Sequence, residues 1–192
     1  MARTKEFDPD VALDRAMHLF WRQGYEATSI QDLVEHMGIG RGSLYDTFGD
    51  KHALYLAALD RYCATVGAGF LAPLDAPIPV RAALRLVFDG AVATALAEGR
   101  HGCLLANGAL ELASRDTDTR CRVEASLRGA EDAIGRALAR AQATGELAAG
   151  RDPRALARYL VNALQGLRVT AKVTDDQGTL EDIARVTLSA LD

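Results

Sequence analysis

The sequence predicts an all-α protein, and three observations carry this prediction. The composition is rich in alanine, leucine and arginine but holds only five prolines and 6% aromatic residues, which favours helices over sheets. Apolar residues recur at steps of three and four along most of the chain, which is the spacing of one helix face. With 192 residues, 49% of them hydrophobic, the chain can form one or two compact domains with buried cores.

The first predicted helix begins after Asp8, an N-cap residue that is followed by Pro9 at the first helical position. Gly24 is expected to end this helix, because glycine readily adopts the left-handed backbone conformation found at helix C-termini. Its apolar stripe predicts burial of one face, formed by Leu13, Ala16, Met17 and Phe20.

Residues 28–51, TSIQDLVEHMGIGRGSLYDTFGDK, predict two short helices joined by a three-residue turn. Thr28 and Ser29 are alternative N-caps of the first of these, because an amide or an acid follows three residues beyond each. Gly38 fits the left-handed position that closes it. Ile30, Leu33, Val34 and Met37 form its buried stripe. The pattern therefore predicts a helix-turn-helix unit.

The second short helix of this unit has a slim polar side. Leu44 and Phe48 are four residues apart and face inward, so small and polar residues are left facing out. Such a helix suits the DNA major groove, where it must approach closely and present donors and acceptors to base edges. Arg41, Tyr45 and Lys51 are placed to contact phosphate. The expected DNA-binding residues are Thr28, Gln31, Arg41, Gly42, Ser43, Tyr45, Asp46, Thr47 and Lys51.

The stretch from about Asp8 to about Leu59 resembles the DNA-binding domain of the TetR family of bacterial transcription regulators. The resemblance rests on LFWRQGYEATSI, on the Gly-Ile turn and on the helix RGSLYDTF, which a lysine soon follows. Two departures concern base reading: Gly40 stands where a serine often caps the recognition helix, and Asp46 and Thr47 stand where an aromatic pair or histidine is frequent. Asp46 can accept a hydrogen bond from a cytosine amino group.

The charge distribution argues against DNA binding driven by charge alone. The net charge is −4, and residues 1–60 carry six lysines and arginines against ten acids. A site-specific protein with few, well-placed cations remains compatible with these numbers. Arg3 and Lys5 belong to a polar arm that either reaches DNA or frays at the terminus. The alternative is a helical ligand-binding or protein-interaction module without DNA binding.

Beyond the helix-turn-helix, a helix is expected from Asp50 to about Phe70, where it could connect the two halves of the chain. The run LAPLDAPIP contains three of the five prolines and predicts a linker. Another helix is expected from Val80 to about Glu98, ended by Gly99.

The apolar segment 101–113 carries Asn107 and Glu111 on one helical face. Either both line a pocket, or the helix is buried with the Asn107 amide satisfied by a neighbour and Glu111 facing solvent. Cys103 is expected in the first turn of this helix, near His101 and Arg100. A helix N-terminus and nearby positive charge lower a thiol pKa, so Cys103 is a candidate sensor; the alternative is a small buried residue.

The remaining chain predicts three more helices, at about 117–144, 153–173 and 180–191. The last two carry more apolar surface than one neighbour covers, which suggests self-association. TetR-like proteins dimerise through a four-helix bundle of this kind, as the resemblance implies. Lys172 either reaches solvent, provides a counter-charge for an acidic ligand or lies beside Cys103. The effector or redox candidates are Cys103, Asn107, Glu111, Gln165, Arg168 and Lys172.

We therefore expect a helix-turn-helix DNA-binding domain at residues 1–60 and a C-terminal helical ligand-binding and dimerisation domain at 61–192. The resemblance implies a homodimeric repressor of a palindromic double-stranded DNA operator, released by a small-molecule or thiol-reactive effector. Four histidines on different elements and the lack of a nucleophile or phosphate-binding motif argue against an enzyme, a cofactor or a metal site. Without a leader, a membrane-spanning run or paired cysteines, a cytoplasmic protein is expected.

Overall fold

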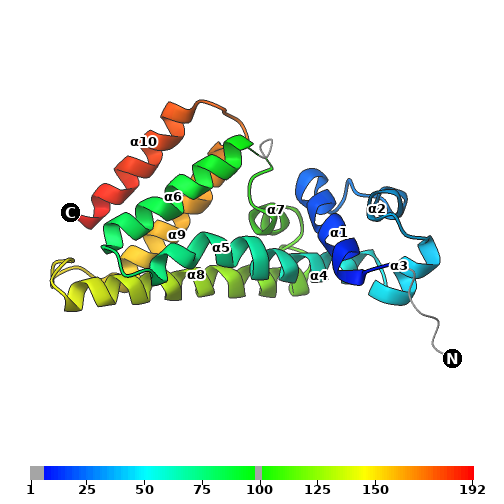
Figure 1. Ribbon diagram of the computed structural model, residues 1–192, viewed down its shortest axis with the longest axis horizontal. Helices are drawn as coiled ribbons and strands as arrows, with labels where there is room; N and C mark the ends of the chain where they lie inside the picture. Colours follow the sequence, from blue (N-terminus) through cyan, green and yellow to red (C-terminus); the bar gives the residue numbers. More distant parts are fainter. Residues whose placement is uncertain (1–6, 98–100) are drawn as a thin grey trace.

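The computed structural model describes residues 7–97 and 101–192, and the regular elements in these ranges are all helical (Figure 1). The all-α prediction is confirmed. Arg3, Lys5, Gly99 and Arg100 lie outside the described residues. The α-helices are α1 (Pro9–Gln23), α2 (Ile30–Met37), α3 (Arg41–Phe48), α4 (Lys51–Tyr62), α5 (Ala68–Leu71), α6 (Val80–Ala97), α7 (Leu104–Glu111), α8 (Thr117–Ala143), α9 (Pro153–Thr170) and α10 (Gln177–Leu188).

The ends of α1 and α2 follow the local signals of the sequence. The Asp8 side chain accepts a hydrogen bond from the Asp10 backbone at 2.8 Å, and Pro9 opens α1. Ser29, not Thr28, caps α2, in a reciprocal capping box with Asp32. Gly38 then closes α2 with a φ of +70°, a left-handed conformation that favours glycine.

The single helix expected from Asp50 to about Phe70 is divided into several helical segments. A π-helical segment, Cys63–Gly67, joins α4 to α5, and a 3₁₀ turn, Ala72–Asp75, follows. Half of the expected linker is therefore helical. In a π-helical segment the hydrogen bonds span five residues, so the side chains beyond it point in different directions from those of an unbroken α-helix.

Figure 1 shows α8 as a long base along which α4 and α5 lie, with α1–α3 at one end and α6, α9 and α10 at the other. One buried cluster holds α6, α8, α9 and α10 together, with Phe88, Ile134, Leu138 and Leu160 at its centre. The other lies beneath α1–α4, around Phe20, Leu33, Leu44 and Tyr55. This second cluster also includes Cys103, Leu104, Leu105, Leu112 and Val123, so it crosses the expected boundary at residue 60.

Membrane insertion finds no support in the described helices. None of them combines the length and the apolar character that crossing a bilayer would require.

Candidate DNA-binding surface and effector cavity

Helix α3 is anchored on one side and open on the other. Leu44 is completely buried, whereas Arg41, Gly42, Tyr45 and Asp46 are exposed and Ser43 is partly exposed. A Cβ built on Gly42 would meet no atom within 4 Å, so packing within the subunit does not require a glycine there. The exposed face is narrow and polar, which is what a helix that enters a major groove needs.

Two further exposed groups flank α3. The Gln31 side chain on α2 is exposed, and its amide nitrogen donates to the Glu35 carboxylate at 2.7 Å. The Lys51 ammonium, at the start of α4, lies 4.3 Å from the centre of the Tyr25 ring. This cation–π contact orients the ammonium while leaving it partly exposed to solvent.

Two of the expected DNA-binding residues turn inward. Thr28 is fully buried, and its hydroxyl donates to the Gly24 carbonyl at 2.6 Å, so it ties the loop to the end of α1 and cannot reach a duplex. The expectation for Thr28 is therefore wrong. The Thr47 hydroxyl oxygen is also buried, and it has no hydrogen-bond partner within residues 7–97 and 101–192. Its polar atom faces the interior, so we withdraw Thr47 as a base-reading residue.

A cavity of about 530 Å³ opens between the α4–α5 run and α7, α8 and α9. Its volume lies within the range of about 300–1,000 Å³ typical of small-molecule sites. Of the six effector candidates, Gln165 and Arg168 line it. The sequence analysis missed Tyr62, Cys63, Phe70 and Ser126, which also line it. Tyr62, Cys63 and Phe70 lie in or beside the π-helical segment, which no sequence pattern indicated, and Ser126 lies on α8.

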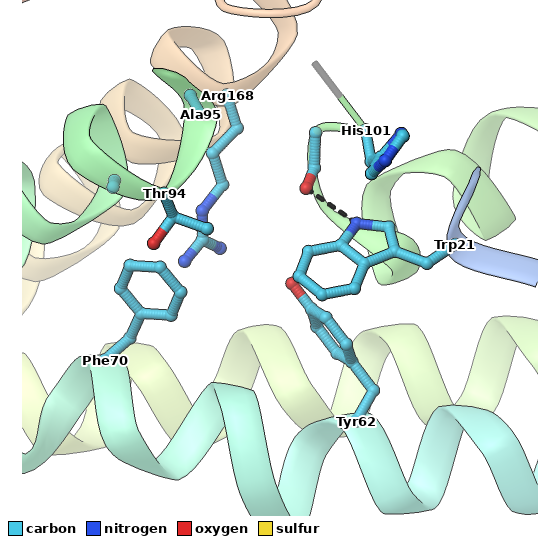
Figure 2. A pocket seen from close by; sticks show the side chains of 9 residues that line it. Trp21, Tyr62, Phe70, Thr94, Ala95, His101 and Arg168 are labelled. Atoms are coloured by element: carbon cyan, nitrogen blue, oxygen red, sulfur yellow. Dashed lines mark hydrogen bonds between the residues drawn. The ribbon is translucent and has the colours of Figure 1, made fainter. Parts of the chain in front are cut away.

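Two polar groups of the cavity, those of Gln165 and Arg168, come from α9. The Gln165 side-chain oxygen is buried without a hydrogen-bond partner among the described residues. The Arg168 guanidinium lies 4.6 Å from the centre of the Phe70 ring. Figure 2 shows Arg168 and Phe70 on one side of an adjoining recess of about 10 Å³, with Trp21, Tyr62 and His101 on the other.

Cys103 is the N-cap residue of α7 and is only 2% exposed. One nitrogen of the Arg168 guanidinium donates to its sulfur at 3.7 Å. Burial, together with the adjacent Cys103 thiol, raises the pKa of the Tyr62 hydroxyl. Burial likewise raises the pKa of the Cys63 thiol, so Cys63 is not an activated nucleophile.

Asn107, Glu111 and Lys172 lie outside the large cavity, and their polar atoms are engaged elsewhere. The Asn107 amide nitrogen donates to the His101 carbonyl at 2.9 Å, and its oxygen accepts from Lys172 at 2.9 Å. The Glu111 carboxylate accepts hydrogen bonds from the backbone N–H groups of Tyr25, at 2.9 Å, and Glu26, at 2.7 Å. These bonds hold neighbouring segments together, and the three residues line a separate, more open recess of about 310 Å³ beside the end of α1.

Comparison with known proteins bears on the identity of the chain. Residues 12–58 match the model of bacterial regulatory proteins of the TetR family, and residues 80–187 match the tetracyclin repressor-like C-terminal domain. The chain is 41% identical to the uncharacterized HTH-type transcriptional regulator YezE of Bacillus subtilis over 100% of both chains. It is 35% identical to the HTH-type transcriptional repressor ComR of Escherichia coli, over 97% of this chain and 90% of ComR.

The chain belongs to the TetR family. A cysteine variant of the TetR-family regulator CifR, solved with 26-base-pair operator DNA, has a TM-score of 0.89 and 31% identity, with 100% of each chain covered. A TetR-family regulatory protein from Rhodobacter sphaeroides has a TM-score of 0.84 and 27% identity over 94% of this chain and 97% of that one. This chain is accordingly a DNA-binding transcription regulator.

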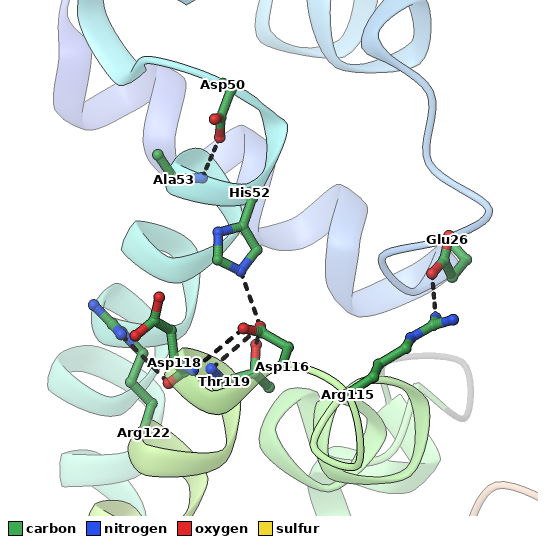
Figure 3. A network of polar contacts seen from close by, with 9 residues as sticks. All are labelled: Glu26, Asp50, His52, Ala53, Arg115, Asp116, Asp118, Thr119 and Arg122. Atoms are coloured by element: carbon green, nitrogen blue, oxygen red, sulfur yellow. Dashed lines mark hydrogen bonds and ion pairs between the residues drawn. The ribbon is translucent and has the colours of Figure 1, made fainter.

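In this TetR-family chain a polar network links the DNA-binding helices to α8 (Figure 3). The His52 ring nitrogen and an Asp116 carboxylate oxygen are 2.9 Å apart, and Arg115 pairs with Glu26. Asp116 also caps α8 by accepting from Asp118 and Thr119. The side chains of His52, Asp116 and Asp118 each bring one possible metal-ligand atom within 4.8 Å of the others. The Asp116 oxygens, however, already accept the capping hydrogen bonds and contact His52.

Helix α7 lies between the cavity and the DNA-binding helices. Leu105 and Ala109 line the cavity, whereas Gly108 packs against Tyr55 of α4. A Cβ on Gly108 would lie 2.5 Å from the Tyr55 hydroxyl, so only glycine permits this approach. The indole nitrogen of Trp21 in α1 donates to the Gly102 carbonyl just before α7, at 2.9 Å. Any displacement of α7 would therefore disturb its contacts with α1 and α4.

Proposed function

We propose that this protein is a homodimeric repressor that leaves a palindromic operator when a small molecule occupies the cavity. The observation that carries the proposal is the position of α7, which contributes one wall of the cavity, packs against α4 through Gly108 and bonds to the loop before α2 through Glu111. A ligand that fits only one of two α7 positions would shift the balance between two dimer geometries.

The proposed DNA contacts divide into two groups. Arg41, Tyr45 and Lys51 contact phosphates and set the position of α3, together with Gln31 at the edge of the unit. Gly42, Ser43 and Asp46 lie on the exposed face of α3 and meet base edges. Two copies related by a two-fold axis would read two half-sites about 34 Å apart, one helical turn of DNA.

An exposed stripe on α9 supports the dimer. It consists of Ala155, Tyr159, Asn162, Gly166, Val169 and, just beyond the helix, Val173, all exposed in the single subunit. The steps alternate between four and three, which is the spacing of a helix seam that packs against another helix. Val173 is 81% exposed and Val186 of α10 is 57% exposed. Apolar side chains this open favour burial against a second copy, with α9 and α10 of each subunit forming a four-helix interface.

The effector is either a reversibly bound small molecule or a thiol-reactive compound that modifies Cys103. The 2% exposure of Cys103 and its contact with Arg168 support the first, since a reagent would need α7 to open before reaching the sulfur. If an electrophile still releases the Cys103→Ser variant from DNA, modification of Cys103 is excluded as the mechanism. If the electrophile no longer releases this variant, modification of Cys103 is supported.

The experiment that tests the proposal is a gel shift of the DNA flanking the protein's own gene, combined with light scattering. We expect a dimer that shifts one palindromic fragment and competes with RNA polymerase in a transcription assay. Val169→Glu should yield a monomer with weakened DNA binding, whereas Leu86→Glu, at a 52% exposed position on α6, should remain a dimer. If the purified dimer shifts no fragment even at low salt, the protein-interaction module is the better description.

A further inference from the structure

The large cavity has an unbalanced positive charge. Among the described residues, Arg168 is the only lysine, arginine, aspartate or glutamate that lines it. Within residues 7–97 and 101–192, no carboxylate forms an ion pair with Arg168; its contacts are the Phe70 ring and the Cys103 sulfur. Stacking on an aromatic ring compensates only part of the cost of removing a guanidinium from water. The unpaired charge of Arg168 therefore favours binding of an anion in the cavity.

A second polar group lies one helical turn away on the same face of α9. The side-chain oxygen of Gln165, three residues before Arg168, is buried and accepts no hydrogen bond from any described residue. Buried acceptors without a partner are rare, because each has lost its water without a replacement. A donor on an occupant of the cavity would supply that bond.

Apart from Tyr62, Cys63 and Ser126, the rest of the wall is apolar. It is formed by residues such as Leu71, Leu105, Ala109, Leu127 and Leu164, with Phe70 beneath the guanidinium. A fully polar or multiply charged molecule would lose its hydration against these side chains without compensation. The occupant must therefore carry one anionic end and an apolar body.

We infer that the effector is an organic acid with a single carboxylate and an apolar body that carries a hydroxyl or amide N–H group. The carboxylate pairs with Arg168, and the N–H or O–H group donates to Gln165. This inference rests on the proposed function, since it names the ligand class of the same cavity. Arg168 also borders the recess that Trp21 and Tyr62 line (Figure 2), so the anionic end would lie on the side of the DNA-binding helices.

The test uses calorimetric titration of the full-length protein with two sets of probes. One is decanoate, decanol and decylamine; the other is 4-phenylbutanoate, 4-phenylbutanol and 4-phenylbutylamine. Within each set the body is constant and only the end group changes. For at least one body, the acid should bind about 10-fold or more tightly than the alcohol and the amine. If in both sets the alcohol or the amine binds as tightly as the acid, or if neither acid binds, the proposal is overturned.

Variants of α9 assign the effect to its residues. Arg168→Gln should weaken binding of the acid roughly 10- to 100-fold and leave the alcohol unchanged. Arg158→Gln is the matched control, since Arg158 is an exposed arginine of the same helix that pairs with Glu131. Gln165→Leu should leave decanoate binding intact and remove any gain that a hydroxydecanoate shows over decanoate. Unchanged acid affinity in Arg168→Gln would refute the assignment.

A gel shift on the same preparations keeps the two proposals apart. If the wild-type protein binds its operator but no acid, the ligand class fails and the regulator stands. If it binds no DNA, the proposed function fails whatever the titrations show.

Discussion

The Tyr25 backbone N–H donates to the carboxylate of Glu111 at 2.9 Å, across 86 residues of sequence. The neighbouring N–H of Glu26 donates to the same carboxylate, so two backbone donors in the loop before α2 are satisfied by the last residue of α7. The helix that borders the cavity is thereby bonded to the segment that positions the helix-turn-helix.

Replacing this carboxylate should uncouple the two parts. We expect Glu111→Ala to lower the free energy of unfolding by about 2 kcal/mol, because two hydrogen bonds to a charged acceptor are lost. Urea unfolding measures this loss. DNA binding should persist, but the amount of effector needed to release the operator should rise. Glu124→Ala is the control: the exposed pair of Glu124 with Arg128 on α8 contributes a few tenths of a kcal/mol. Equal losses in both variants would contradict the role of Glu111.

Gly42→Ala should separate stability from DNA binding. No atom lies within 4 Å of the added Cβ, so the helix should gain up to about 1 kcal/mol from the better helix former. The methyl group would nevertheless stand on the face proposed to meet bases, and operator affinity should fall at least about 10-fold. Gly69→Ala, an exposed helical glycine in α5 with equally open space, should stabilise without affecting DNA. Thermal unfolding and gel shifts give the two readouts. Normal operator affinity in Gly42→Ala would exclude close approach of α3.

Thr28→Val should reduce stability without changing base preference. The substitution keeps the shape of the buried side chain but removes the hydroxyl that donates to the Gly24 carbonyl, at a cost of about 1–2 kcal/mol. Thr28→Ser retains the hydroxyl and should restore part of this loss. Selection from a randomised operator should return the same consensus for all three proteins. A new consensus for the valine variant would mean that Thr28 reaches the duplex after all.

The Asp116 carboxyl should make stability depend on pH in the acid range. Burial alone would raise its pKa, but hydrogen bonds from Thr119 and His52 outweigh it and lower the pKa from 3.8 to about 2. Because the folded pKa is the lower one, this contribution is present above about pH 4 and is lost as the pH falls towards 2. Asp116→Asn keeps an N-cap side chain but cannot titrate. Urea unfolding between pH 2 and 5 should therefore show a flatter dependence in this variant; identical slopes would contradict the assignment.

Local signals predicted local structure well. Asp8 with Pro9, Ser29 with Asp32, and Gly38 act within a few residues, and in the structure they mark the start of α1 and both ends of α2. Local sequence could not decide whether Thr28 or Ser29 is the N-cap, because Gln31 and Asp32 follow them by three residues and either pair could form a capping box. The Thr28 hydroxyl instead bonds to a carbonyl four residues earlier, and only the packed loop decides this.

Long-range contacts limited what the sequence could predict of the site. Asn107, Glu111 and Lys172 are polar residues in apolar surroundings, a pattern that fits pocket lining and inter-helix bonding equally well. Their partners lie 6 to 86 residues away along the chain. Gln165 and Arg168, polar residues on an apolar helix, line the cavity, whereas Cys63 and Ser126 carried no pattern that distinguished them from helix surface.

The buried cluster beneath α1–α4 has consequences for anyone who wishes to study the DNA-reading half in isolation. A fragment ending at residue 60 would lack Leu104, Leu105 and Leu112, which cover that cluster in the intact chain. The apolar surface exposed in this fragment should cause it to aggregate or to lack a fixed tertiary structure. A stable fragment should therefore extend through α7 and the first turns of α8.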